Sequence, residues 1–242
     1  MAGPADPEGI PLSDPTAPID PEQAARTLGR TLAAKHTTAP STDGRVDLAV
    51  FASLVRATAE ADDDAIFDSG PYLDRSRHEM ARLAVETVTA LPESDIAEVS
   101  ITPGFELGMV ELQRDGSMVV LGDTVVGDRH LDLARAAVAL ALRFGPAVVA
   151  PFLDAYGLDD IDVRRLDTCQ LLGSVAEEVG VAEPVDAPCP TFGLLTGSIR
   201  WRSSGRLPPA SRRLRLRSSI AFAGEAVRQN SSRSTRCRST AG

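Results

Sequence analysis

The sequence predicts a mostly helical α+β domain in which one β-hairpin separates an earlier group of helices from a later one. Apolar residues recur every three or four positions over residues 20–91 and again over residues 131–179, the spacing of one buried helix face. Between these stretches, short apolar runs flank an Asp115-Gly116 pair, which is typical of a tight hairpin turn. Hydrophobic residues make up 43% of the 242 residues and aromatic residues 4%, so we expect a sizeable core filled by aliphatic side chains.

Three helices are expected before the hairpin. The first starts where Asp20 can cap it and continues to about Lys35, with apolar residues every four positions. The second runs from residue 47 to about residue 60. The third begins at the Ser-Arg-His-Glu capping box of residues 76–79 and ends before Pro92.

The middle of the chain changes to a strand-like pattern. Apolar runs at residues 99–101, 109–112 and 118–121 lie between turn residues. We expect a loop followed by one small β-hairpin.

Three further helices are expected after the hairpin. Residues 131–144 are nearly all apolar, which predicts a central, buried helix. Pro146 opens the next helix, which runs to residue 156 with Gly157 as its C-cap candidate. The last helix covers residues 162–179.

Composition divides the chain into three parts. Five prolines in residues 1–19 indicate an extended lead-in, and residues 20–180 carry the helical pattern of a compact domain. Residues 181–242 are predicted to be an irregular, disordered tail. Its end, residues 200–242, holds 11 arginines and a single acidic residue, Glu225.

The same composition excludes several functional classes. The Arg-rich tail contains only Trp201 and Phe222 as aromatic residues, so nucleic-acid binding is not favoured. The net charge is −9, which favours a small cationic partner. Three widely spaced cysteines indicate neither a disulfide framework nor a zinc site. The most apolar stretch, residues 131–153, is too polar for a membrane span, and no signal peptide is visible, so the expected location is the cytoplasm.

Several motifs, taken in order, are similar to those of one enzyme family. Residues 125–134 read Val-Val-Gly-Asp-Arg-His-Leu-Asp-Leu-Ala, residues 152–158 read Phe-Leu-Asp-Ala-Tyr-Gly-Leu, and residues 28–32 read Leu-Gly-Arg-Thr-Leu. Over roughly residues 10–178 the chain resembles the C-terminal lobe of the aminoglycoside phosphotransferases, which are kinase-like enzymes. The ATP-binding N-terminal lobe of that family has no expected counterpart, since no Gly-rich loop and no sheet-forming sequence precede residue 20.

The resemblance implies phosphoryl transfer from ATP, with Mg²⁺, to a hydroxyl of a small cationic molecule. The family's catalytic loop reads His-Gly-Asp, four variable residues and Asn, and a later Asp supplies a second metal ligand. Here Gly104 stands at the catalytic Asp, Met109 at the magnesium-binding Asn and Val120 at the second metal-binding Asp. None of these side chains accepts a proton or binds a hard cation. Asp123, three residues after Val120, is the one candidate for a replacement metal ligand.

Other motif residues are expected to have structural roles. By resemblance, Asp132 supports the loop that contains Gly104, although a plain helix-cap role fits its position equally well. Asp128 matches a turn residue of the family and is also assigned to loop support. We expect His130 at the surface or at a helix cap, and His36 and His78 at the surface.

Three hypotheses about function follow. In the first, the chain is a phosphotransferase by resemblance that lacks activity in this form. Alternatively, it is a non-catalytic, pseudokinase-like binding module that uses an acidic groove. As a third alternative, it is a truncated and frame-shifted relic, and the other reading frames of the neighbouring DNA would decide that case.

Overall fold

The computed structural model describes residues 9–38, 44–61, 65–67, 72–92 and 98–185. The arginine-rich end of the chain and the acidic run at residues 62–64 lie outside the described residues. The helices and strands follow one another in this order: β1 (Ile10–Pro11), α1 (Pro21–Thr37), α2 (Leu48–Ala59), α3 (Arg77–Thr89), β2 (Val99–Ile101), β3 (Val110–Leu112), β4 (Met118–Val120), β5 (Val125–Gly127), α4 (Arg129–Phe144), α5 (Val149–Tyr156) and α6 (Val163–Val179).

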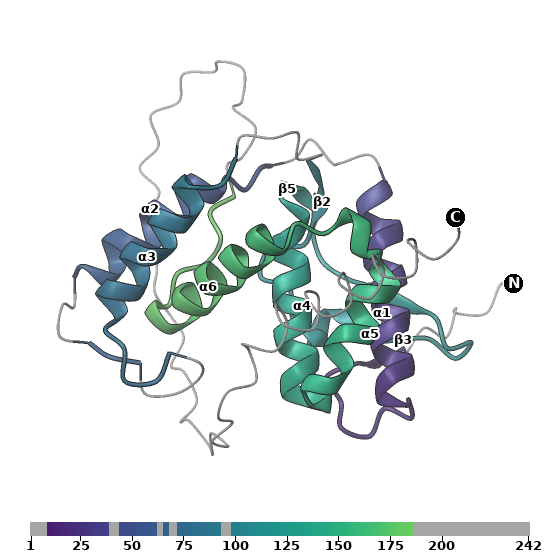
Figure 1. Ribbon diagram of the computed structural model, residues 1–242. Helices are drawn as coiled ribbons and strands as arrows, with labels where there is room; N and C mark the ends of the chain where they lie inside the picture. Colours follow the sequence, from purple (N-terminus) through teal and green to yellow (C-terminus); the bar gives the residue numbers. More distant parts are fainter. Residues whose placement is uncertain (1–8, 39–43, 62–64, 68–71, 93–97, 186–242) are drawn as a thin grey trace, which may run out of the picture.

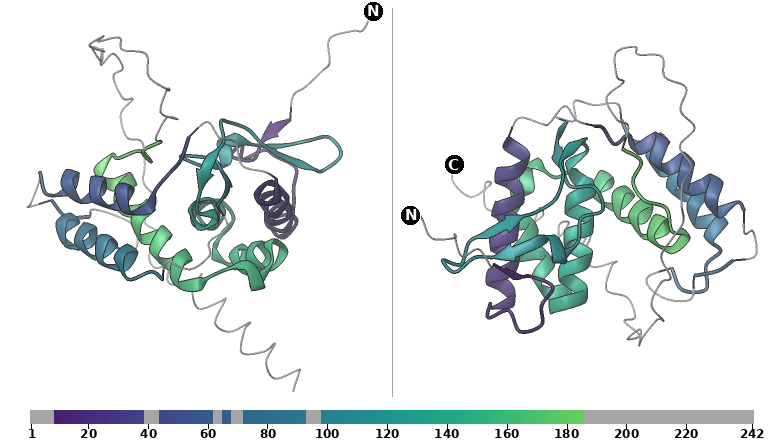
Figure 2. Two further views of the ribbon diagram at one scale, coloured as in Figure 1. Left: turned by 90° about the horizontal axis from the view of Figure 1, so that it is seen from above. Right: turned by 180° about the vertical axis from the view of Figure 1, so that it is seen from behind.

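The helices form two groups that α6 joins. Helices α1, α4 and α5 pack together, α2 and α3 form a pair on the other side, and α6 contacts α4 as well as the pair (Figures 1 and 2). Two small antiparallel sheets lie beside the three-helix group. This arrangement confirms the predicted mostly helical α+β class.

Side-chain caps explain where the predicted helices begin. Asp20, Asp47 and Asp162 each accept two backbone N–H groups at the start of α1, α2 and α6, and Ser76 accepts one at the start of α3. Helix α4 begins two residues earlier than expected, because Asp128 accepts the N–H of His130 and so caps the helix. Asp132 therefore lies inside the first turn of α4 and is not its cap.

Helices α1 and α5 approach each other closely at Gly29. A Cβ atom at this position would collide with the backbone carbonyl oxygen of Phe152 and lie 3.0 Å from the backbone nitrogen of Tyr156. The absence of a side chain at Gly29 thus allows the two helix backbones to come into contact.

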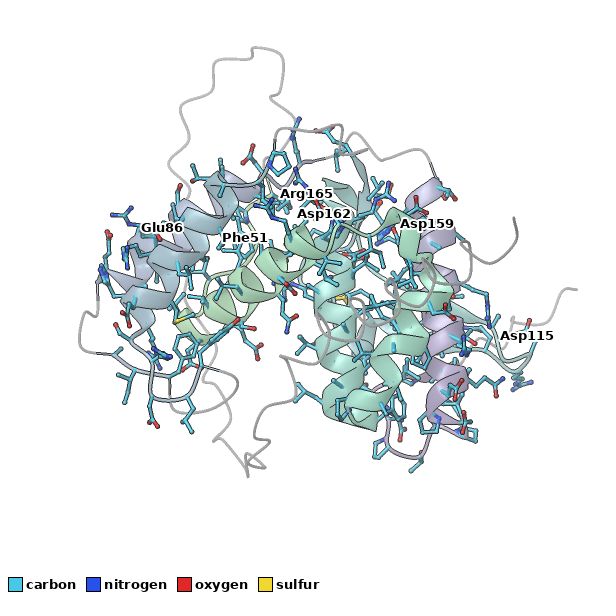
Figure 3. All side chains as sticks on the ribbon, in the orientation of Figure 1. Phe51, Glu86, Asp115, Asp159, Asp162 and Arg165 are labelled. Carbon is cyan, nitrogen blue, oxygen red and sulfur yellow. The ribbon has the colours of Figure 1, made fainter. Side chains whose placement is uncertain are left out.

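The predicted hairpin is present, together with further strand pairing that the sequence analysis missed. Strands β3 and β4 pair antiparallel around the Asp115-Gly116 turn, whose tip projects from the body (Figure 3). Residues 99–101, expected to lie in a loop region, form β2 and pair with β5, with Ser100 opposite Val126. The sequence could not show this pairing, because the two strands are far apart in sequence and each is too short to carry a pairing pattern.

The compact region extends further toward both ends of the chain than the predicted residues 20–180. Residues 10–11, placed in the lead-in, form β1 and pair with β3, and the next residue, Leu12, is fully buried in the core. Residues 181–185, placed in the tail, fold back onto the domain after Gly180 ends α6 in a left-handed conformation. None of the helices in these described ranges has the length and apolar character needed to cross a membrane.

Candidate functional site

The loop that follows β2 is fixed at its start by a buried aspartate. The Asp132 carboxylate accepts the backbone N–H of Thr102 at 3.0 and 3.2 Å and is only 1% exposed. The first turn of α4 positions this carboxylate behind the loop that leads to Gly104. The structure thus brings Asp132 to the loop named from the sequence, and excludes an exposed capping role for it.

The end of α1 adds two more partners to the same carboxylate. The Lys35 ammonium lies 2.8 Å from Asp132 Oδ2 and also contacts the Thr102 hydroxyl, and His36 Nε2 lies 3.2 Å from the same oxygen. His36 Nδ1 lies 2.9 Å from the Tyr156 hydroxyl. Since a carboxylate only accepts, His36 Nε2 carries a proton and donates it to Asp132. Burial raises the pKa of Tyr156, which keeps this hydroxyl protonated.

The expectation that His36 lies at the surface is wrong, since only 6% of this residue is exposed. A signal for its burial was present in the sequence. His36 continues the four-residue spacing of Leu28 and Leu32, which are both fully buried in α1. His78 is half-buried rather than exposed.

A second buried network surrounds Asp128 at the start of α4. His130 Nδ1 lies 2.6 Å from one Asp128 oxygen, and the Arg165 guanidinium lies 3.1 Å from the other. His130 Nε2 accepts the backbone N–H of Asp162 at 3.0 Å, which links α4 to the start of α6. His130 is therefore a buried, neutral connector, and the expected surface position was wrong.

The charge state of Asp128 follows from its partners. Burial alone would raise the pKa of this carboxyl group, but the hydrogen bonds that it accepts from His130, together with the charge of Arg165, lower it below the usual range. Asp128 thus caps α4 and holds α6 through its hydrogen bonds with His130 and Arg165.

Glu183 is the residue of this region that sequence reasoning missed. Its Oε2 accepts the backbone N–H of Gly104 at 2.7 Å, and its Oε1 lies 2.7 Å from Arg135 Nε on α4. The side chain is 1% exposed. The only sequence signal was Gly180, whose left-handed conformation reverses the chain at the end of α6 and returns residues 181–185 toward the loop.

A pocket opens beside Gly104, between α4 and α6. Its volume is about 350 Å³. Eight of its lining residues are apolar or glycine, two are neutral and polar, and three are charged: Glu106, Arg135 and Glu177. One wall is formed by Val138, Ala139 and Leu142 of α4, and the opposite one by Cys169, Gln170, Gly173 and Ser174 of α6. Both hydrogen-bond partners of Glu183 belong to this lining.

The comparisons with known proteins identify the architecture. No protein-family model matches the sequence, and no curated protein matches it at a significant level. Among solved structures, an aminoglycoside-3'-phosphotransferase of type VIII aligns over 69% of this chain and 66% of its own, with TM-score 0.55 and 21% identity. A spectinomycin phosphotransferase in complex with ADP and spectinomycin aligns over 71% and 57%, with TM-score 0.53 and 14% identity. The chain has an aminoglycoside-phosphotransferase-like fold. It spans less than two thirds of the length of these structures.

Within this phosphotransferase-like fold, the positions named from the sequence lie around one loop. Gly104 is exposed and in a left-handed conformation, with φ +65° and open space where a Cβ would be. Met109 and Val120 are half-buried, at the end of a 3-10 turn and at the end of β4. A Cβ on Gly122 would lie 3.5 Å from Thr102 and 4.0 Å from Met109, so the segment after β4 meets the loop here.

These residues do not fit a magnesium ion. Hard cations require oxygen ligands, whereas Met109 and Val120 offer a thioether and a hydrocarbon. The Lys35 ammonium already contacts Thr102 at this place and would repel a second cation. Asp123 is exposed, and within the described ranges no three His, Cys, Asp or Glu side chains are grouped to hold a metal.

Proposed function

We propose that this phosphotransferase-like lobe binds a small cationic molecule in the pocket beside Gly104, and that it does not by itself transfer a phosphoryl group to it. The pocket carries the proposal. It borders the loop on which the resembled family carries its chemistry, and two of its three charged lining residues are glutamates. The third, Arg135, is already neutralised by Glu183. The solved relatives are described as phosphotransferases of aminoglycosides and spectinomycin, which are small amine-bearing molecules.

The volume and lining of the pocket suit a ligand of modest size. About 350 Å³ lies at the lower end of the range for small-molecule sites. Glu106 and Glu177 are both exposed, so they meet ammonium groups of a ligand without paying for the burial of a bare carboxylate. Gln170 and Ser174 offer neutral hydrogen-bonding groups to hydroxyls on the α6 side.

The proposed lack of transfer rests on the chemistry of the loop. A general base typically contributes 10² to 10⁴-fold to a rate, and Gly104 has no side chain to act as one. Glu183, although it binds the Gly104 N–H, is 1% exposed and engaged by Arg135, so a substrate hydroxyl does not reach it. ATP and Mg²⁺ remain the donor and metal implied by the resemblance alone.

Calorimetric titration of the full chain with kanamycin, an aminoglycoside, tests the binding. We expect saturable binding that weakens several-fold in Glu177→Gln, because one attractive charge at the pocket is lost. Glu86→Gln is the matched control, since Glu86 is an exposed glutamate on α3, away from α4 (Figure 3). Equal weakening in both variants, or no binding to the wild-type chain, would reject the pocket as the site.

A radiolabelled-ATP transfer assay tests the second half of the proposal. We expect no phosphorylated kanamycin with Mg²⁺ and ATP present. Turnover that disappears in Asp123→Ala would overturn this expectation, and it would make Asp123 the replacement metal ligand.

A further inference from the structure

A buried ion pair lies directly behind the pocket wall. Arg135 contributes to the pocket lining, and its Nε donates to Glu183 at 2.7 Å. The Glu183 side chain is 1% exposed and that of Arg135 is 23% exposed. Arg135 thus contributes to the pocket lining while its guanidinium pairs with Glu183, and the pair is only partly accessible to water.

This arrangement determines the sign of the charge that the pocket offers to a ligand. With Arg135 paired, the exposed Glu106 and Glu177 dominate, and the lining attracts cations. An unpaired Arg135 would instead place a positive charge within several ångströms of any bound ammonium. Two unit charges about 8 Å apart at an effective dielectric constant of about 20 change an affinity roughly thirtyfold before salt screening.

We infer that Glu183 is the specificity-determining residue of this pocket, which makes it selective for cations over anions by neutralising Arg135. Its second bond supports this role. The Gly104 N–H donates to the other oxygen of the same carboxylate at 2.7 Å, so two donors from different elements converge on one anionic group. Without that carboxylate, the same pair of donors forms a binding site for an external carboxylate at the edge of the pocket.

The claim that Glu183 makes the pocket selective for cations rests on the proposed function. The claim that Arg135 and the Gly104 N–H bind an external carboxylate when Glu183 is removed does not. Two measurements on the full chain therefore keep them separate. The first is kanamycin affinity, and the second is the response of the Gly104 amide resonance to added sodium acetate, with sodium chloride of equal ionic strength as reference.

The variants are chosen to separate charge from structure. Glu183→Ala removes the carboxylate, and Glu183→Gln keeps its volume while removing its charge. The double variant Glu183→Ala with Arg135→Met also removes the unpaired guanidinium. Glu178→Ala is the matched control, because Glu178 pairs with Arg77 at 2.6 Å on the α3 side of α6, outside the pocket.

We expect kanamycin affinity to fall at least about tenfold in Glu183→Ala and Glu183→Gln, to recover to within about threefold in the double variant, and to change little in Glu178→Ala. We expect saturable acetate binding at the Gly104 amide in Glu183→Ala and in none of the other proteins compared. Recovery in the double variant is the readout that a merely structural role of Glu183 would not give.

Three results would overturn the inference. These are an unchanged kanamycin affinity in Glu183→Gln, no recovery in the double variant, and no acetate response in folded Glu183→Ala. If the wild-type chain binds no kanamycin, the proposed function fails, and the acetate experiment alone decides whether Glu183 fills an anion site. If Glu183→Ala does not fold, the Glu183→Gln affinity and a double variant built on Glu183→Gln replace it.

Discussion

Replacing Asp132 by alanine would remove a carboxylate that three groups share. These are the Thr102 N–H at 3.0 Å, the Lys35 ammonium at 2.8 Å and His36 Nε2 at 3.2 Å. The side chains of Asp132 and His36 are 1% and 2% exposed, so water does not easily replace the lost acceptor. All three donors would then be left without this partner in or near the core, and the loop before Gly104 would lose its anchor.

Two kinds of contact determine how much stability Asp132→Ala should lose. The loop contact alone would cost about 1–3 kcal/mol, the penalty for leaving a buried donor unsatisfied. Removing one partner of a buried ion pair costs about 3–5 kcal/mol. The contacts share one carboxylate and do not add, and the 14% exposure of the Lys35 side chain allows its ammonium to keep some hydration. We therefore expect a total of about 3–5 kcal/mol, against roughly 5–15 kcal/mol for the stability of a typical domain.

Urea unfolding of the full chain would measure this loss, from the transition midpoint and slope of wild type, Asp132→Ala, Lys35→Met and the double variant. The double variant should lose less than the sum of the two single losses, because Lys35 has no stranded charge once it is methionine. Asp154→Ala, which removes an exposed ion pair with Arg26, should leave the midpoint nearly unchanged. A loss below about 1 kcal/mol for Asp132→Ala, or full additivity with Lys35→Met, would refute the reasoning.

Further predictions concern the core and its acid stability. Because the folded-state pKa of Asp128 is lowered, its contribution to stability is full above the unfolded pKa of about 3.9 and is lost as pH falls through the lower folded value. Asp128→Asn should therefore be less stable at pH 7, and the gap in urea midpoint should narrow below about pH 4. Gly29→Ala should destabilise by at least about 1–3 kcal/mol in the same assay, since its Cβ meets the Phe152 carbonyl, and unchanged stability would contradict the close helix contact. Cys169 is 1% exposed and its pKa is raised well above the usual value by burial, so mass spectrometry should find it labelled by a thiol reagent only after unfolding.

The helices could be predicted from the sequence because their signals are local. Asp20, Ser76 and Asp162 cap helices within three residues of themselves, and apolar spacing defines the buried face. The pairing of β2 with β5 has no such signal. It joins Val99 to Gly127 across the whole intervening hairpin, and nothing local to either strand specifies the partner.

The candidate site was predictable only in part, for a related reason. Asp132 was assigned to the loop by the resemblance of its motif to that of a known family, whereas Glu183 lies outside those motifs and reaches Gly104 through a chain reversal at Gly180. His36 was misjudged because a polar residue at the end of an amphipathic helix suggests solvent. The burial of His36 depends on Asp132 as a partner, and that partner is 96 residues away along the chain.

The contrast between Asp132 and Gly104 also explains how this loop can keep its shape with a glycine at position 104. A change at Asp132 strands several buried donors, so the fold itself resists it. Gly104 is exposed and has open space where a Cβ would lie, so a side chain here would meet no packing clash, although its left-handed φ of +65° favours glycine. The backbone N–H of Gly104 is nevertheless satisfied by Glu183, and the start of the loop is held by Asp132. The architecture around the pocket is therefore maintained by Asp132 and Glu183, whose contacts do not depend on a side chain at position 104.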